Sequence, residues 1–268
     1  MQFMEELTSA GRKYGNTHRF ESISRMSTRE QASKGVDRLP DEEVSRTSAI
    51  MALGGYTSAA RMKRIFTSLD RLFPNAHCAL VYRSPFELLV ATILSAQCTD
   101  KRVNQITPVL FERYPTAQDF AVLHPEVLER EVYSTGFFRS KSKNIIGASK
   151  RIVQEFKGNV PRTMAELLTL PGIARKSANV VLGSAYGIAG GIVVDTHALR
   201  VATRRLRLSQ AKDPEGVEQD LLKLVPRKRW IQFSYQFTLF GREVCTARHP
   251  RCAECPLEAI CDSPEKTV

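Results

Sequence analysis

The sequence predicts an all-α protein. From about residue 56 onward, apolar residues recur at helical spacing, and Gly, Pro or polar residues separate one run from the next. Strand-like alternation is scarce, and the short run "GGIVVD" at 190–195 is interpreted as a buried connector. The chain of 268 residues, 43% of them hydrophobic, is long enough for one large domain or two smaller ones with a sizeable core.

Capping residues mark several of the expected helices. Ser84, Pro85 and Glu87 form an N-cap, a first-turn proline and a capping box, and Thr163 and Glu166 form a second box. Gly136 and Gly158 end two of the helices. The expected helices cover residues 84–97, 99–115, 125–136, 140–158, 163–172, 173–186, 196–207, about 215–224 and 230–240.

The basic charge of the chain is confined to its helical part. Residues 1–55 are rich in Ser, Thr, Arg and Glu and are predicted to be a mobile tail with a short helix at most. Residues 1–50 hold eight basic and eight acidic residues, so the remaining 31 basic and 20 acidic residues carry the net charge of +11. A basic folded region favours a polyanionic partner, most simply a nucleic acid, although many soluble proteins are basic without one.

The sequence predicts no membrane association and no export. No apolar run approaches the roughly 20 residues that a membrane span requires, and the first residues lack the charged-then-apolar pattern of a signal peptide. We expect a monomer in the cytosol or nucleus, and in the cytoplasm beside the nucleoid if the source is bacterial.

Four of the six cysteines lie close together near the C-terminus. Cys78 and Cys98 stand apart among apolar residues and are expected to be buried thiols. The others have the spacing C-x6-C-x2-C-x5-C, with little apolar sequence to fold around, which indicates a metal centre. A single close pair with two outlying cysteines favours an iron–sulfur cluster over zinc, and disulfides are disfavoured in the cytosol. These four residues are Cys245, Cys252, Cys255 and Cys261.

The stretch "LPGIARKSANVV" at 170–181 predicts two helices joined by a tight turn. The backbone N–H groups at the start of the second helix would form an anion site suited to a DNA phosphate. Lys176 falls in the first turn of that helix, where the helix dipole and the neighbouring Arg175 disfavour an ammonium and favour the neutral, nucleophilic amine. Taken alone, such a residue is more often a solvated surface lysine.

The stretch "VVDTHALRV" places Asp195 between an apolar connector and a helix. The ordinary interpretation is an N-cap aspartate. A capping aspartate also has a fixed side-chain conformation, so the same residue can serve as a carboxylate at the mouth of a cleft.

These motifs together resemble the endonuclease III family of helix-hairpin-helix DNA glycosylases. The resemblance rests on "LPGIARKSANVVLGSAYG", "VVDTHALRVATRRL", "SPFELLVATILSAQCTD", "STGFFRSKSKNI" and the cysteine spacing, and it spans about residues 61–262. It implies a six-helix barrel over 78–188, and an iron–sulfur domain built from 56–77 and 189–268 that carries a [4Fe-4S] cluster on the four clustered cysteines.

The resemblance also implies the activity and the residues that perform it. The activity is removal of oxidised pyrimidines from double-stranded DNA, followed by β-elimination 3′ to the abasic site. Lys176 matches the nucleophile and Asp195 the catalytic carboxylate. Gln97 matches the residue that fills the space of the extruded base, and Phe137 stands where the family has an apolar wedge. The remaining implied DNA contacts are Gly172, Ala174, Arg175 and His197.

One residue departs from the family pattern. The hairpin normally reads Gly-hydrophobic-Gly, and here it reads Gly172-Ile173-Ala174. We expect the methyl group of Ala174 to weaken the phosphate contact. Two alternatives remain open: a monofunctional glycosylase of the same superfamily, such as the adenine-mismatch type, or a non-catalytic iron–sulfur protein that binds damaged DNA. A ribosomal or RNA-binding role leaves Lys176 and Asp195 unexplained.

Overall fold

The computed structural model of the chain describes residues 58–267. The predicted tail, 1–55, lies outside the described residues. Every regular element between residues 58 and 267 is a helix, which confirms the all-α prediction, and the "GGIVVD" segment is a connector without regular secondary structure. None of the described helices is long and apolar enough to cross a lipid bilayer.

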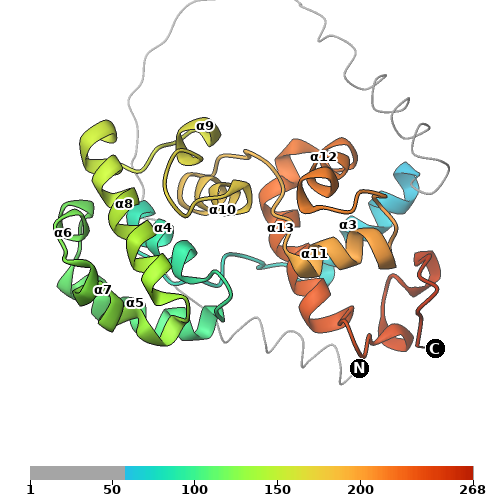
Figure 1. Cartoon of the computed structure of the whole chain (residues 1–268). Coiled ribbons are helices and arrows are strands. Elements are labelled where there is room, and N and C mark those ends of the chain that lie inside the picture. Colours follow the sequence, from blue (N-terminus) through green and yellow to red (C-terminus); the bar gives the residue numbers. More distant parts are fainter. Residues whose placement is uncertain (1–57, 268) are drawn as a thin grey trace, which may run out of the picture.

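The helices form two groups that lie side by side (Figure 1). The first group runs continuously along the chain and is shown in teal, green and yellow. It contains α4 (Pro85–Leu94), α5 (Asp100–Arg113), α6 (Ala117–Ala121), α7 (Pro125–Val132), the 3-10 turn η1 (Tyr133–Thr135), α8 (Phe138–Phe156), α9 (Met164–Leu167) and α10 (Arg175–Tyr186).

The second group combines the start of the described chain with its C-terminal part (Figure 1). Helix α3 (Ala59–Leu72) packs against α13 (Trp230–Leu239) although about 160 residues separate them. The other members are α11 (Thr196–Arg200), the π-helical turn η2 (Val201–Arg205), α12 (Pro214–Leu224), η3 (Arg227–Arg229), the π-helical turn η4 (Phe240–Val244), η5 (Cys252–Glu254) and η6 (Glu258–Ile260).

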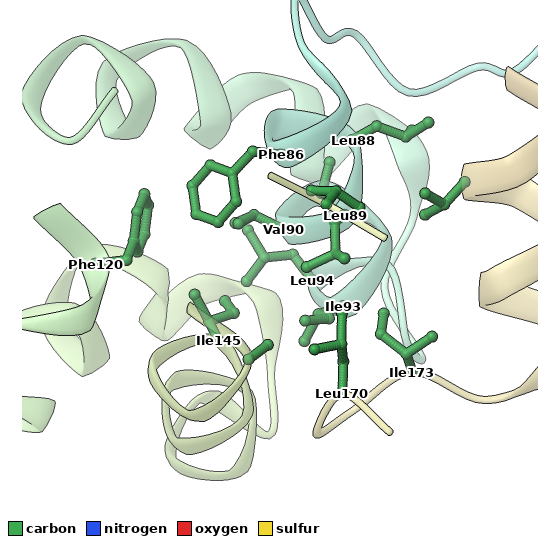
Figure 2. Close-up of a cluster of buried hydrophobic side chains, with 14 of the residues drawn as sticks. Phe86, Leu88, Leu89, Val90, Ile93, Leu94, Phe120, Ile145, Leu170 and Ile173 are labelled. Carbon is green, nitrogen blue, oxygen red and sulfur yellow. The ribbon is translucent and has the colours of Figure 1, made fainter. Parts of the chain in front are cut away.

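Each group has its own hydrophobic core. In the first, α4 is apolar on all sides, and its Leu88, Leu89 and Val90 have no exposed surface. Figure 2 shows this helix surrounded by side chains from α6, α8 and the segment that leads into α10. The second core joins residues 62–73 to residues 192–257. The two cores support the predicted division at residues 77/78 and 188/189, and we retain that division as a proposal.

Capping residues and helical periodicity predicted most helix starts correctly, and the observed helices differ from the predicted ones in several details. Ser84 caps α4 by accepting a hydrogen bond from the Glu87 N–H (3.1 Å), but the Glu87 carboxylate accepts from the Arg83 N–H (2.6 Å), so the predicted box closes in one direction only. Helix α4 also ends at Leu94 instead of residue 97, because the Ser95 hydroxyl donates to the Thr92 carbonyl (2.8 Å) at its C-terminus. The short helix α6 and the N-terminal α3 were not assigned individually from the sequence.

The two groups meet along one face of α10. Gly183 leaves room for Ile231 of α13, since a Cβ atom added to Gly183 would lie 3.4 Å from the Ile231 side chain. At the next residue of α10, the Ser184 hydroxyl is hydrogen-bonded to the Tyr235 hydroxyl. Burial raises the pKa of Tyr235, so this phenol stays neutral. These contacts hold the C-terminal end of α10 against the second group of helices.

Candidate functional site

The second helix of the hairpin begins two residues later than predicted, and Lys176 still lies in its first turn. Ala174 is the N-cap of α10, with φ −99° and ψ 172°, and the preceding turn is closed by the Ile173 N–H bonding to the Leu170 carbonyl (3.1 Å). Within the described residues, the side chain of Lys176 is exposed and has no hydrogen-bond or ion-pair partner. Its amine is therefore accessible to a ligand.

The start of α10 has the features of an anion site. The N-cap residue Ala174 has no side-chain acceptor, so within the described chain the N–H groups of the first turn are not capped by a side chain. The preceding turn is anchored in the first core by Leu170 and Ile173, which point toward α4 (Figure 2). A rigid turn with outward N–H groups can bind a phosphate oxygen.

Glycine is required at one of the two positions flanking Ile173. Gly172 has φ 81°, and an added Cβ atom would lie 2.9 Å from the Cβ of Asn144. Ala174 has a negative φ that any residue adopts, so the departure from the family pattern introduces no backbone strain. The expected effect of the Ala174 methyl on the phosphate distance stays a prediction.

We expect Gly172→Ala to destabilise the protein by about 1–3 kcal/mol, because alanine at positive φ is strained and its methyl meets Asn144. The matched change Ala174→Gly should alter the free energy of unfolding by less than about 0.5 kcal/mol. Glycine is a better N-cap than alanine, and this gain offsets the larger backbone entropy that glycine loses on folding. Urea unfolding of both variants tests this. Equal destabilisation by the two changes would contradict the assigned backbone geometry.

Arg175 lies in the hairpin, but its guanidinium is directed into the protein. Its Nε atom donates to a Glu218 carboxylate oxygen of α12 at 2.6 Å, and Asn179 Nδ2 donates to the other oxygen at 2.9 Å. Glu218 is only 3% exposed and the Arg175 side chain is 30% exposed, so the pair is a partly buried link between the two groups of helices. Gly191 of the connector makes room for it, since an added Cβ there would overlap the Glu218 carboxylate. Arg175 therefore positions α10, and a DNA contact from it stays a prediction.

Asp195 caps α11, and only one of its two oxygens is used for capping. The Oδ1 atom accepts from the N–H groups of His197 (3.0 Å) and Ala198 (2.8 Å). The Oδ2 atom faces Arg242, whose guanidinium lies 3.8 Å away and also donates to Asp100 at the start of α5 (3.1 Å). The carboxylate thus has a fixed orientation, and its second oxygen is held near the junction of the two groups.

His197 follows directly and is partly buried. A Cβ atom on Gly241 would lie 2.9 Å from the Cβ of His197, so this histidine packs closely against η4. Its Nδ1 atom is buried and has no hydrogen-bond partner in the described chain. The predicted DNA contact from His197 remains untested.

Gln97 and Phe137 share an unusual backbone conformation. Their φ values are 51° and 48°, in the left-handed region that residues other than glycine seldom adopt. Both side chains are exposed, and Phe137 is 65% exposed although it is a large apolar residue. Such a ring on the surface is available to a ligand with a flat apolar face, as a base pair has.

The four clustered cysteines line one pocket together with apolar and basic side chains. All six cysteines of the chain are free, and Cys78 and Cys98 are half-buried instead of fully buried. Burial raises the pKa of Cys245 to about 11, which Arg205 partly opposes, and burial raises the pKa of Cys255 to about 11. Four soft thiolate donors in an apolar pocket bordered by cations fit an anionic iron–sulfur cluster.

A second cavity has a volume of about 830 Å³, and one of the residues that line it is Thr196, which directly follows Asp195 in the chain. Arg204, Arg207 and Lys212 line it, and all three side chains are exposed and make no ion pair within residues 58–267. No motif in the sequence predicts a role for these residues, although the stretch "RVATRRLRLSQAK" is rich in basic residues. A basic cavity beside Asp195 extends the surface that can take phosphate groups.

Two family models match the chain. Residues 90–227 match the HhH-GPD superfamily of base excision DNA repair proteins, and residues 245–261 match the iron–sulfur binding domain of endonuclease III. The second match begins at Cys245 and ends at Cys261, so it spans the four clustered cysteines and overturns the zinc and disulfide alternatives. A [4Fe-4S] cluster is the cofactor of this family domain.

Relatives and solved structures agree with these matches. The endonuclease III proteins of Synechocystis sp. and Bacillus subtilis are 53% and 44% identical over 76% of this chain and 92% and 94% of their own lengths. A structure of a trapped endonuclease III–DNA covalent intermediate is 39% identical, with a TM-score of 0.73 over 77% of this chain and 96% of its own. A non-covalent endonuclease III–DNA complex is similar, at 40% identity and a TM-score of 0.73. With two family models, full-length relatives and the same fold in agreement, this chain belongs to the endonuclease III family.

Proposed function

We propose that this chain is a bifunctional DNA glycosylase and abasic-site lyase of base-excision repair, with oxidised pyrimidines in double-stranded DNA as its substrates. The observation that carries the proposal is the exposed amine of Lys176, which has no partner within the described chain and stands beside uncapped N–H groups of α10. The relatives named endonuclease III, one of them trapped as a covalent DNA intermediate, support it.

Lys176 acts as the nucleophile. After the damaged base leaves the helix, the neutral amine attacks C1′ of the deoxyribose and the C1′–N bond to the base breaks. The sugar ring opens to a Schiff base between C1′ and Nζ, which makes the C2′ proton acidic. Loss of that proton expels the 3′ phosphate, so the strand is cut 3′ to the site by β-elimination.

Asp195 supplies the negative charge of the site. Its Oδ1 atom is committed to the α11 cap, so Oδ2 is the oxygen that stabilises the cationic sugar and assists deprotonation of Lys176. Arg242 at 3.8 Å orients that oxygen. Because the cap fixes the side chain, the carboxylate needs little reorganisation when positive charge develops on the sugar.

The remaining proposed roles concern DNA binding. The turn at Gly172 and Ala174 binds a backbone phosphate, Gln97 occupies the space of the extruded base, and Phe137 replaces the lost stacking. Cys245, Cys252, Cys255 and Cys261 hold the [4Fe-4S] cluster, which organises a basic loop when bound. We place the protein in the cytoplasm in association with the nucleoid, in keeping with its bacterial relatives.

A panel of duplex oligonucleotides tests the proposal. Each duplex carries one lesion, such as an oxidised pyrimidine, an adenine mismatch or an abasic site, and base release and strand nicking are scored separately. We expect both steps on oxidised pyrimidines, and nicking alone on abasic sites. Base release without nicking would favour a monofunctional glycosylase, and tight binding without turnover would favour a non-catalytic paralogue.

A further inference from the structure

Lys141, in the first part of α8, is buried without a carboxylate partner. It is 3% exposed, and its Nζ atom donates to the Thr135 carbonyl oxygen at 2.8 Å. No acidic side chain of residues 58–267 forms an ion pair with it. Burial lowers the pKa of Lys141, and the nearby Cys98 raises it. Placing an ammonium here is unfavourable for stability, and an unbranched apolar side chain would fill the same space.

The bond to Thr135 spans the turn that presents Phe137. Thr135 is itself fixed, because its hydroxyl donates to the Val132 carbonyl at 2.7 Å. The next two residues, Gly136 and Phe137, both have positive φ, at 69° and 48°. On the far side of this turn, the backbone N–H of Lys141 donates to the Phe137 carbonyl at 3.0 Å. Lys141 therefore binds the residue before the left-handed pair through its side chain, and the second residue of the pair through its backbone N–H.

The two hydrogen bonds of Lys141 stabilise the backbone conformation of Phe137. A left-handed conformation is unfavourable for a phenylalanine and persists only when the surrounding structure holds it. The Phe137 ring is 65% exposed, so its own packing does little to hold it. Without the Nζ contact, the turn loses one of the two hydrogen bonds by which Lys141 fixes it.

We infer that Lys141 is a positioning residue for base extrusion: its buried ammonium, hydrogen-bonded to the Thr135 carbonyl, holds the turn that presents Phe137 to the DNA. The inference rests on the proposed function, because it assigns Phe137 to the gap in the DNA. It predicts that Lys141 influences opening of the duplex and has no effect on the chemistry of Lys176.

The test uses the full chain with Lys141→Met, which keeps the length and removes the donor, and Lys141→Arg, which keeps a donor. Lys150→Met, an exposed lysine further along α8, is the matched control. Fluorescence of 2-aminopurine placed opposite an abasic site reports unstacking on binding. Single-turnover assays give base release from a duplex lesion and cleavage of a single-stranded abasic oligonucleotide, which requires no duplex opening.

For Lys141→Met we expect a smaller fluorescence increase and base release from duplex slowed about tenfold to a hundredfold. Cleavage of the single-stranded substrate should stay within about twofold, and the unfolding midpoint should not fall, because a buried unpaired charge has been removed. Lys141→Arg should restore part of the fluorescence signal. An unchanged signal and rate, or equal slowing on single-stranded and duplex substrates, would overturn the inference.

A double-mutant cycle with Phe137→Ala keeps the inference testable even if one variant is poorly stable. If Lys141 acts through Phe137, Lys141→Met should have little further effect on duplex base release in the Phe137→Ala background. Additive effects would count against it. If the wild-type protein releases no base, the proposed function has failed, whereas the fluorescence comparison of Lys141→Met with Lys150→Met on abasic duplex still decides the role of Lys141.

Discussion

Replacing Lys176 by glutamine should abolish the covalent adduct that borohydride traps between the protein and abasic or oxidised-pyrimidine DNA. Glutamine has a similar length but no nucleophilic amine, so nicking should fall on the order of 10³-fold or more. DNA affinity should be largely retained, because the backbone N–H groups at the start of α10 are unchanged. The measurement is single-turnover nicking with borohydride trapping.

The same substitution should stabilise the fold slightly. Lys176 places a cation at the positive end of the α10 dipole, which is unfavourable by about 0.3–1 kcal/mol. Lys150→Gln, with the same charge change on an exposed part of α8, is the control and should leave trapping intact. An undiminished adduct in Lys176→Gln would disprove its role as the nucleophile.

Asp195 should show separable catalytic and structural effects. In Asp195→Asn the side-chain oxygen can still accept from the N–H groups of His197 and Ala198, so stability should change little. Base release should nevertheless fall about 10²- to 10³-fold, because the negative charge that stabilises the cationic sugar is gone. Asp195→Ala should show a similar loss of activity and an additional loss of about 1 kcal/mol of stability, because the cap is removed as well.

Urea unfolding and single-turnover base release on both variants measure these two effects independently. If Asp195→Asn were fully active while Asp195→Ala was inactive, the residue would matter for activity only through the cap. Arg242 keeps a partner in either variant, since it also donates to Asp100. Rearrangement of Arg242 is therefore not expected to obscure the comparison.

The parts of this protein that sequence alone predicted are those encoded by short-range patterns. Ser84 caps a helix whose apolar residues fill the first core, and Asp195 caps the helix after the buried connector. The spacing from Cys245 to Cys261 indicated an iron–sulfur domain, which the family comparison bears out. Capping, helical periodicity and ligand spacing operate over a few residues, so one sequence is enough to recognise them.

Sequence reasoning was less successful where a residue's partner lies far along the chain. Arg175 was expected to contact DNA, and that contact stays a prediction, but its ion pair with Glu218, 43 residues away, could not be foreseen. The end of α4 was placed too late, so Gln97 was expected in a helix instead of a left-handed turn. The pairing of Arg175 has no local signal, because Glu218 lies on another helix, whereas the early end of α4 coincides with the local hydrogen bond from Ser95 to Thr92.

The sequence by itself determined that this chain is helical, that it carries four cysteines spaced for a cluster, and that a lysine begins the hairpin's second helix. Only the tertiary structure decided which of the hairpin's cations is unpaired: within the described residues Lys176 is exposed without a partner, while the partly exposed Arg175 is paired with Glu218. It also decided that Gly172 needs to be glycine and Ala174 does not. The physical reason is that accessibility, ion pairing and steric contact are set by atoms from other helices, which packing alone brings together.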